Sequence, residues 1–100
     1  MKEQDFQKKI TKYLESQGAY VVKVITASKK GVPDILACYK GRMIGCEVKT
    51  PTTMKNTSEL QKYNLAKIKE AGGLSLVACS IEQVEPYLLL IDTEEYEDED

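Results

Sequence analysis

Apolar and polar positions alternate along the chain with two different periods. Apolar residues recur every three or four positions over 2–17 and again over 58–71, which is typical of a helix that packs one face against a core. Short apolar runs rich in β-branched residues lie between and after these segments, and they predict strands over 19–26, 35–39, 42–49 and 74–79. The last strand follows a crossover helix, so it should pair parallel to a strand of the same sheet.

The C-terminal part of the chain predicts a broken helix and an acidic tail. Ser80 and Gln83 resemble a capping box, but Pro86 should end that turn and start a second helix that runs to Ile91. Residues 92–100 hold seven of the sixteen acidic residues and are expected to be disordered. We therefore predict one α/β domain over 1–91, with the element order α-β-β-β-α-β-α and a mixed sheet flanked by helices, followed by a tail over 92–100.

The pair Lys40-Gly41 separates two of the apolar runs and predicts a two-residue β-hairpin turn. Cross-strand partners then have residue numbers that add up to 81, which puts Asp34 opposite Glu47 with Cβ atoms roughly 5 Å apart. Lys49 lies on the same face, two residues beyond Glu47. Because like charges so placed repel, a divalent cation with oxygen ligands is the expected partner.

A simpler interpretation exists for part of this pattern. In a chain with 30% charged residues, a Glu-x-Lys triplet is common and usually marks an exposed strand with a weak ion pair. The whole constellation is more specific, because Asp34, Glu47 and Lys49 interrupt otherwise apolar strands.

These residues match the pattern of the PD-(D/E)xK nuclease superfamily, and the chain resembles the virus-type replication-repair nuclease (VRR-NUC) domain of the stand-alone phage or bacterial type. The resemblance covers most of the chain up to about Ile91 and is carried by Gly31, Pro33, Asp34, Gly41, Glu47, Val48, Lys49, Ser58, Gln61, Gly72 and Gly73. It implies a restriction-endonuclease-like core and DNA cleavage that depends on Mg²⁺ or Mn²⁺. The metal would be held by Asp34, Glu47 and the Val48 carbonyl, with Lys49 beside the attacking water.

Two further site residues have competing interpretations. Glu3 lies on the core face of the first helix, either as an acidic residue that favours the helix dipole or, as the resemblance implies, as an outer metal ligand, with Gln4 and Gln7 as competitors. Gln61 is either the capping partner of Ser58 or, by its match to the family's helix glutamine, part of the active site. The two roles of Gln61 would compete for one side chain, and the resemblance favours the site.

Charge and composition restrict the remaining chemistry. Residues 1–91 hold fourteen basic and nine acidic residues, a net charge of +5. This modest excess is typical of a nucleic-acid-binding protein, but also of an ordinary soluble surface. Loop residues Ser28, Lys29, Lys30 and Lys55 are candidates for phosphate contacts. Three cysteines without histidine argue against a disulfide framework, a zinc site and a histidine base, and all three cysteines should be buried in strands.

The sequence therefore predicts a hydrolase that cuts phosphodiester bonds in DNA, selective for four-way junctions or other branched substrates of replication and repair. We expect a homodimer with the apolar run 87–91 as its interface, no organic cofactor, no membrane partner and a cytoplasmic location. One alternative is a nucleic-acid-binding module of the same fold without turnover. Another is a regulatory protein whose acidic tail engages a basic partner.

Overall fold

The computed structural model describes the backbone of residues 1–97, and the element order α-β-β-β-α-β-α is confirmed. The elements are α1 (Glu3–Ser16), β1 (Tyr20–Lys23), β2 (Ile35–Tyr39), β3 (Arg42–Val48), α2 (Glu59–Glu70), β4 (Leu74–Ala78) and α3 (Ile81–Glu97). No helix in this part of the chain is long and apolar enough to span a bilayer, and the cytoplasmic location stays a prediction.

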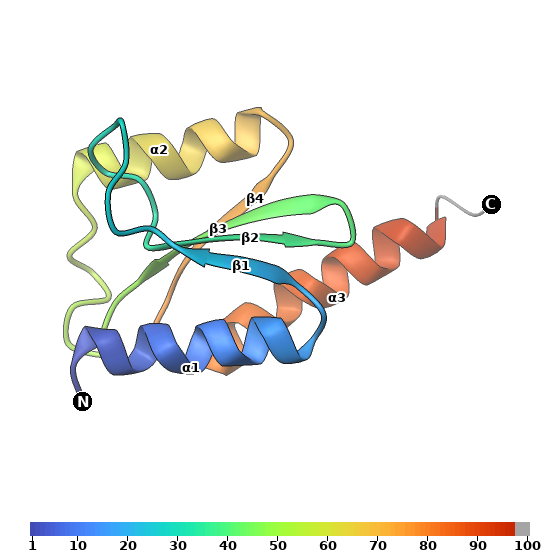
Figure 1. Ribbon diagram of the computed structural model, residues 1–100. Helices are drawn as coiled ribbons and strands as arrows, with labels where there is room; N and C mark the ends of the chain where they lie inside the picture. The colour runs from blue at the N-terminus through green and yellow to red at the C-terminus, as the bar shows by residue number, and fades with distance from the viewer. Residues whose placement is uncertain (98–100) are drawn as a thin grey trace.

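The four strands form one mixed sheet in the order β1-β2-β3-β4. The first three strands are antiparallel, and β4 pairs parallel to β3, as the crossover helix requires. Figure 1 shows α1 and α3 on one face of the sheet and α2 on the other. The main core lies between the sheet and the α1–α3 layer and contains Ile10, Leu14, Ile35, Ile44, Val48, Val84, Leu88 and Ile91.

The β2–β3 hairpin has the predicted turn and register. Ile35 pairs with Cys46 and Tyr39 with Arg42. The turn residues have positive φ angles of 47° at Lys40 and 82° at Gly41, which is the geometry of a type I′ turn and explains the glycine at the second position. This register brings Asp34 and Glu47 to the open end of the hairpin.

Strand β1 is shorter than predicted, because its pairing with β2 ends early. Lys23 pairs with Ile35, and the Val24 N–H still donates to the Asp34 carbonyl oxygen at 2.8 Å. The residue before Asp34 is Pro33, which has no N–H and so cannot continue the hydrogen bonds between the two strands. The β-branched residues after Val24 therefore belong to the loop.

Helix α3 corrects the prediction of a break at Pro86. The helix is continuous from Ile81 to Glu97 with Pro86 inside it. Val84 and Leu88 are buried on either side of the proline, and the proline itself is exposed. Packing of the apolar face therefore holds the helix together. The backbone hydrogen bond that Pro86 cannot donate is lost on the side that faces solvent.

The acidic segment is helical where the sequence predicts disorder. Asp92 Oδ1 accepts hydrogen bonds from the Tyr39 hydroxyl and from Lys40 Nζ, both at 2.8 Å, and Glu94 forms an ion pair with Arg42. The acidic segment thus meets the cations of the hairpin tip, and the predicted boundary at residue 91 falls inside α3. The prediction for 98–100 concerns residues outside the described part of the chain.

The cysteines are less uniform than predicted. Cys46 is buried in β3, but Cys38 is exposed on β2, and Cys79 is half-buried just beyond the end of β4. The exposed position of Cys38 follows from the sheet, since α2 lies over β3 and β4 and leaves this part of β2 open.

Candidate active site

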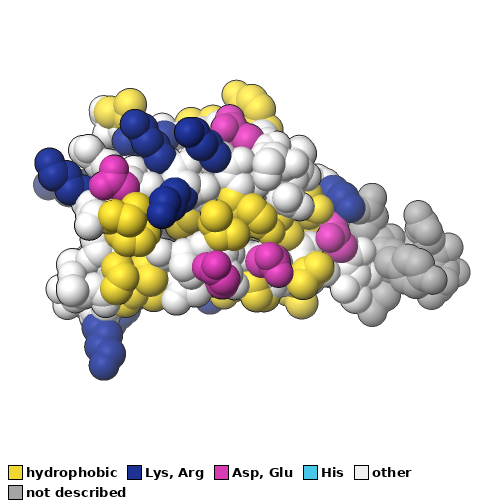
Figure 2. Space-filling model, turned by 90° about the horizontal axis from the view of Figure 1, so that it is seen from below, with side chains coloured by type: hydrophobic (Ala, Val, Ile, Leu, Met, Phe, Trp, Pro, Cys, Tyr) yellow, Lys and Arg dark blue, Asp and Glu magenta, His cyan; other side chains and the backbone are white. Residues whose placement is uncertain are grey.

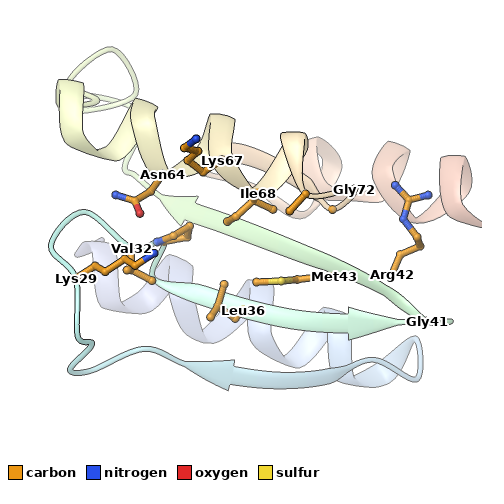
Figure 3. A pocket seen from close by; sticks show the side chains of 13 residues that line it. Lys29, Val32, Leu36, Gly41, Arg42, Met43, Asn64, Lys67, Ile68 and Gly72 are labelled. Atoms are coloured by element: carbon orange, nitrogen blue, oxygen red, sulfur yellow. The ribbon is translucent and has the colours of Figure 1, made fainter.

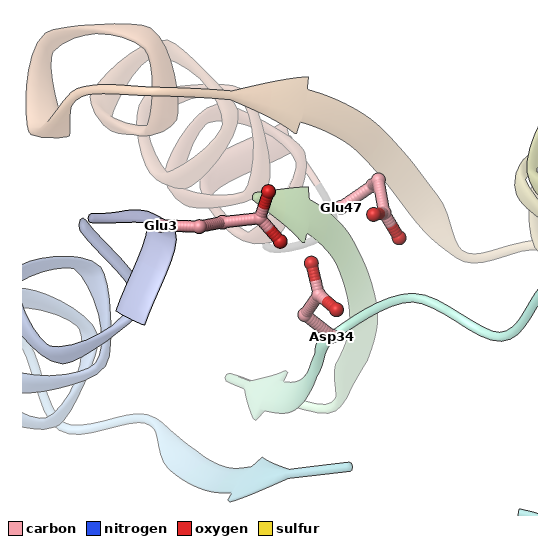
Figure 4. Close-up of side chains that lie close together, drawn as sticks. All are labelled: Glu3, Asp34 and Glu47. Carbon is pink, nitrogen blue, oxygen red and sulfur yellow. The ribbon is translucent and has the colours of Figure 1, made fainter. Parts of the chain in front are cut away.

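Three carboxylates from three different elements lie close together at the open end of the hairpin (Figure 4). They are Glu3 in the first turn of α1, Asp34 just before β2 and Glu47 in β3, and one oxygen of each lies within 4.8 Å of the others. Glu47 is only 3% exposed, whereas Glu3 and Asp34 are half-buried. The acidic pair predicted from the hairpin register is thus joined by the acidic residue that the sequence left with two interpretations.

The backbone of β3 holds Asp34 in place. The Val48 N–H donates to Asp34 Oδ2 at 2.9 Å, and the following N–H, of Lys49, donates in the other direction to the Ala78 carbonyl of β4 at 2.9 Å. Because the N–H and C=O of one residue in an extended strand point the same way, the Val48 carbonyl faces the side on which Asp34 lies. This direction is the one that a carbonyl ligand beside Asp34 requires.

A hydrogen bond closes the first turn of α1. The Lys2 backbone N–H donates to Asp5 Oδ2 at 2.8 Å, which satisfies a donor at the start of the helix. Glu3 is therefore presented from an ordered turn. Of its two competitors, Gln4 is exposed, and Gln7 is buried one turn further along the helix.

The carboxylate cluster strongly disfavours a charge on Glu47. The pKa of Glu47 is raised from 4.5 to about 8, chiefly by burial. The charge of Asp34, a hydrogen bond with Asp34 and the charge of Glu3 raise this pKa further, and the charge of Lys49 lowers it. A raised pKa for one member of the pair is what the sequence predicts from two facing carboxylates. Without a cation, this site therefore favours a proton on Glu47, and any cation bound here competes with that proton.

Lys49 and Gln61 complete the group around Glu47. Lys49 is 9% exposed, and its Nζ lies 3.8 Å from Glu47 Oε2 and 3.4 Å from Gln61 Oε1. Gln61 Nε2 donates to Glu47 Oε2 at 3.1 Å. The carboxylate that carries the raised pKa is thus contacted by both predicted neighbours.

Gln61 also caps α2, so the expected competition between its two roles is wrong. The side-chain Oε1 of Gln61 accepts from the Ser58 backbone N–H at 2.9 Å, while the backbone N–H of Gln61 donates to Ser58 Oγ at 3.1 Å. The side-chain amide has an acceptor and a donor at opposite ends. The acceptor closes the capping box, and the donor reaches Glu47.

The donor set fits a hard divalent cation. Mg²⁺ binds oxygen ligands at about 2.0–2.1 Å, which places neighbouring ligand oxygens roughly 3–4 Å apart. Three carboxylate oxygens within 4.8 Å of one another need only small side-chain rotations to reach that spacing. An ion here would also compensate the negative charges of Asp34 and Glu3, which add to the effect of burial on the pKa of Glu47.

The residues predicted to contact phosphate lie in two loops at this end of the molecule. Ser28, Lys29 and Lys30 are exposed in the loop between β1 and β2, and Lys55 is exposed in the loop between β3 and α2. Figure 1 shows both loops at the end of the sheet where α1 begins. Sequence reasoning missed Asn64, which follows Gln61 by three residues on α2 and donates to the Lys30 carbonyl.

Charge is unevenly distributed on the side of the molecule formed by α1 and α3. Figure 2 shows a hydrophobic band with most of the lysine side chains, and some acidic ones, along one edge and acidic side chains along the other. The exposed lysines of α1 include Lys8, Lys9 and Lys12, and α3 exposes Glu82 and Glu85. Because α1 also carries Glu3, Asp5 and Glu15, its charges balance, and the basic excess of the body comes mainly from the segments between α1 and α3.

Comparisons with known proteins agree on the class of this domain. A family model described as archaeal Holliday junction resolvase (Hjc) matches residues 1–99. A solved structure titled "VRR_NUC domain" is 26% identical, covers 84% of this chain and 90% of its own chain, and superposes with a TM-score of 0.66. A search of curated proteins gives no match. Both findings indicate a VRR-NUC-like nuclease domain, and the family model specifies the resolvase family, which the sequence analysis did not name.

Proposed function

Since the chain belongs to the archaeal Holliday junction resolvase (Hjc) family, we propose that it is a divalent-metal-dependent DNA endonuclease that cuts four-way junctions. The observation that carries this proposal is the convergence of Glu3, Asp34 and Glu47 within 4.8 Å beside a buried lysine. A module that only binds DNA has no need of a buried acidic cluster, which repels phosphate.

Each residue of the cluster has a role in the proposed reaction. Asp34, Glu47 and the Val48 carbonyl would hold Mg²⁺ or Mn²⁺, and Glu3 would serve as an outer ligand. Such an ion would supply Lewis-acid chemistry, that is, a lower pKa for a water and stabilisation of negative charge on the phosphoryl oxygens. Lys49 donates to the attacking water or to the phosphate, and its ammonium counters the added negative charge.

Gln61 is a positioning residue in this scheme. Through its two ends it ties the capped start of α2 to Glu47 and receives a hydrogen bond from Lys49. Lys29, Lys30, Lys55 and Ser28 contact phosphates that flank the scissile bond. These contacts orient the DNA without reading its sequence, as cutting by structure requires.

The proposal includes a homodimer, because paired cuts in a four-way junction need two sites. The predicted interface run 87–91 is half core, since Leu88 is 3% and Ile91 1% exposed, while Leu89 and Leu90 are exposed. Apolar side chains also line a groove of about 510 Å³ on the other face, between α2 and the hairpin (Figure 3). We place the second copy at the end of this groove formed by Met43, Ile68 and Gly72, which Figure 3 shows away from Lys29 and Asn64.

Cleavage of labelled DNA tests the proposed function. The wild type should nick four-way junctions in Mg²⁺ or Mn²⁺ but not in EDTA, and should cut single strands, duplexes and flaps at least tenfold more slowly. Glu47→Ala and Lys49→Ala should abolish cutting while circular dichroism shows a folded protein. Tight junction binding without cutting in any metal would favour the non-catalytic binding module instead.

A further inference from the structure

The loop between β1 and β2, which carries Lys29 and Lys30, is attached to α2 by one side chain. Asn64 Nδ2 donates to the Lys30 carbonyl oxygen at 3.0 Å and to the Leu60 carbonyl oxygen at 2.9 Å. Figure 3 shows Asn64 reaching from the helix toward this loop. The attachment is at the backbone of Lys30, so it fixes the course of the loop and leaves the lysine side chain free to reach a ligand.

Gly31 provides an independent contact at the same point. Its φ of +81° lies in the region that favours glycine, and a Cβ there would lie 2.8 Å from Leu60 Cγ and 3.0 Å from Asn64 Nδ2. The loop backbone therefore packs directly on α2 with no space for a side chain. Two different features hold the loop against the helix at this position.

The same helix also holds the catalytic carboxylate. Gln61, three residues before Asn64, donates to Glu47 Oε2 at 3.1 Å, and residues three apart on a helix lie on neighbouring turns of one face. Two side-chain amides on α2 thus fix Glu47 and the lysine loop relative to one another.

We infer that Asn64 is a positioning residue for DNA, which holds Lys29 and Lys30 at a fixed place relative to the carboxylates so that they bind phosphates beside the cut. This inference rests on the proposed function, since it takes DNA as the ligand. Asn64 itself touches no reacting group. Its loss should therefore weaken binding of DNA and leave the chemical step unchanged.

Binding of a fluorescently labelled four-way junction, measured by anisotropy in EDTA at several salt concentrations, tests this inference without cleavage. Asn64→Ala should raise the Kd about three- to tenfold, the effect of losing the order that a hydrogen bond provides. It should also reduce the salt dependence of binding, because fewer phosphates are neutralised. Gln17→Ala, a similar truncation at the exposed end of α1 away from both loops, should bind like the wild type.

A double-mutant cycle separates positioning from a general effect on the fold. In a background that lacks both lysines (Lys29→Ala with Lys30→Ala), Asn64→Ala should have no further effect on the Kd. Gly31→Ala disturbs the same attachment from the loop side and should reproduce the weaker binding, which covers the case in which Asn64→Ala folds poorly. In cleavage assays, Asn64→Ala should raise KM with kcat within about twofold, whereas Gln61→Ala should lower kcat.

Wild-type Kd in both Asn64→Ala and Gly31→Ala would overturn the inference, as would an undiminished effect of Asn64→Ala without the lysines. The proposed nuclease can fail separately. A wild type that binds the junction but never cuts it would leave the inference standing on the binding data, while a wild type that binds no DNA would refute both.

Discussion

The raised pKa of Glu47 makes the stability of the metal-free protein depend on pH in a direction opposite to that of most carboxylates. A pKa of 4.5 in the unfolded chain and about 8 in the folded protein means that the folded state keeps a proton that the unfolded state releases. The contribution of Glu47 to stability is therefore complete below pH 4.5 and is lost as pH rises toward 8. At about 1.4 kcal/mol per pH unit, the free energy of unfolding falls by about 3 kcal/mol between pH 4.5 and 7.

Glu47→Gln should remove this dependence, because the amide keeps the shape of the protonated acid and cannot ionise. We expect urea unfolding in EDTA to show the variant gaining stability over the wild type by about 3 kcal/mol from pH 4.5 to pH 7. Glu59→Gln, at an exposed carboxylate whose side chain is 94% accessible, is the matched control and should follow the wild type.

Metal should close most of the difference in stability between the two proteins at pH 7. Mn²⁺ at a hundred times its Kd should stabilise the wild type by about 2.7 kcal/mol at pH 7 to 8, and this gain should shrink at lower pH as protons compete for Glu47. The variant should gain little from Mn²⁺. A stability difference that stays constant from pH 4.5 to 8, or an equal effect of Mn²⁺ on both proteins, would refute the reasoning.

Three further predictions concern the tail, the dimer and the core. Deleting residues 94–100 should leave junction cleavage intact or raise it, because it frees Arg42 from its acidic partner, and it should cost no more than about 1 kcal/mol of stability in urea unfolding; loss of cleavage would indicate a functional tail. Met43→Lys, which puts a charge in the apolar groove, should convert the dimer to a monomer in light scattering, and an unchanged mass would move the interface elsewhere. Ser75→Ala should destabilise the protein by about 1–3 kcal/mol, because its buried hydroxyl donates to the Leu65 carbonyl oxygen at 2.7 Å; an unchanged urea midpoint would contradict that role.

Local patterns explain why most of the fold could be predicted from the sequence. The turn at Lys40-Gly41 fixes the hairpin register, and that register carries Asp34 and Glu47 to the same end. The capping box at Ser58 is likewise a short-range signal, confirmed by its hydrogen bonds. These features depend on residues close together in the chain, where propensity and spacing are informative.

The errors concern contacts between distant segments. Asp92 is held by Tyr39 and Lys40, more than fifty residues earlier, and nothing within residues 92–100 indicates such partners. Glu3 is a partial case, because the resemblance implied a ligand there but the residue pattern left two interpretations, and only the packing of α1 on the sheet places it beside Asp34. The attachment of the lysine loop by Asn64 is also long-range, and its only local signal is the three-residue spacing from Gln61.

The double role of Gln61 explains why glutamine, rather than glutamate, occupies the third position of this capping box. Glutamate would cap the Ser58 N–H equally well, but it has no N–H to donate to Glu47.

Gln61→Glu should therefore keep the stability of α2 while placing a further negative charge against a carboxylate whose pKa is already raised to about 8. We expect nearly unchanged urea unfolding at pH 5, where a carboxyl in this cluster is more readily protonated, but cleavage reduced at least tenfold at pH 8, since Glu47 loses its hydrogen-bond donor and the new carboxylate competes with it for Lys49. Gln61→Ala, which removes both roles, should also lose about 1 kcal/mol of stability. Full cleavage by Gln61→Glu would show that the amide acts only as a cap.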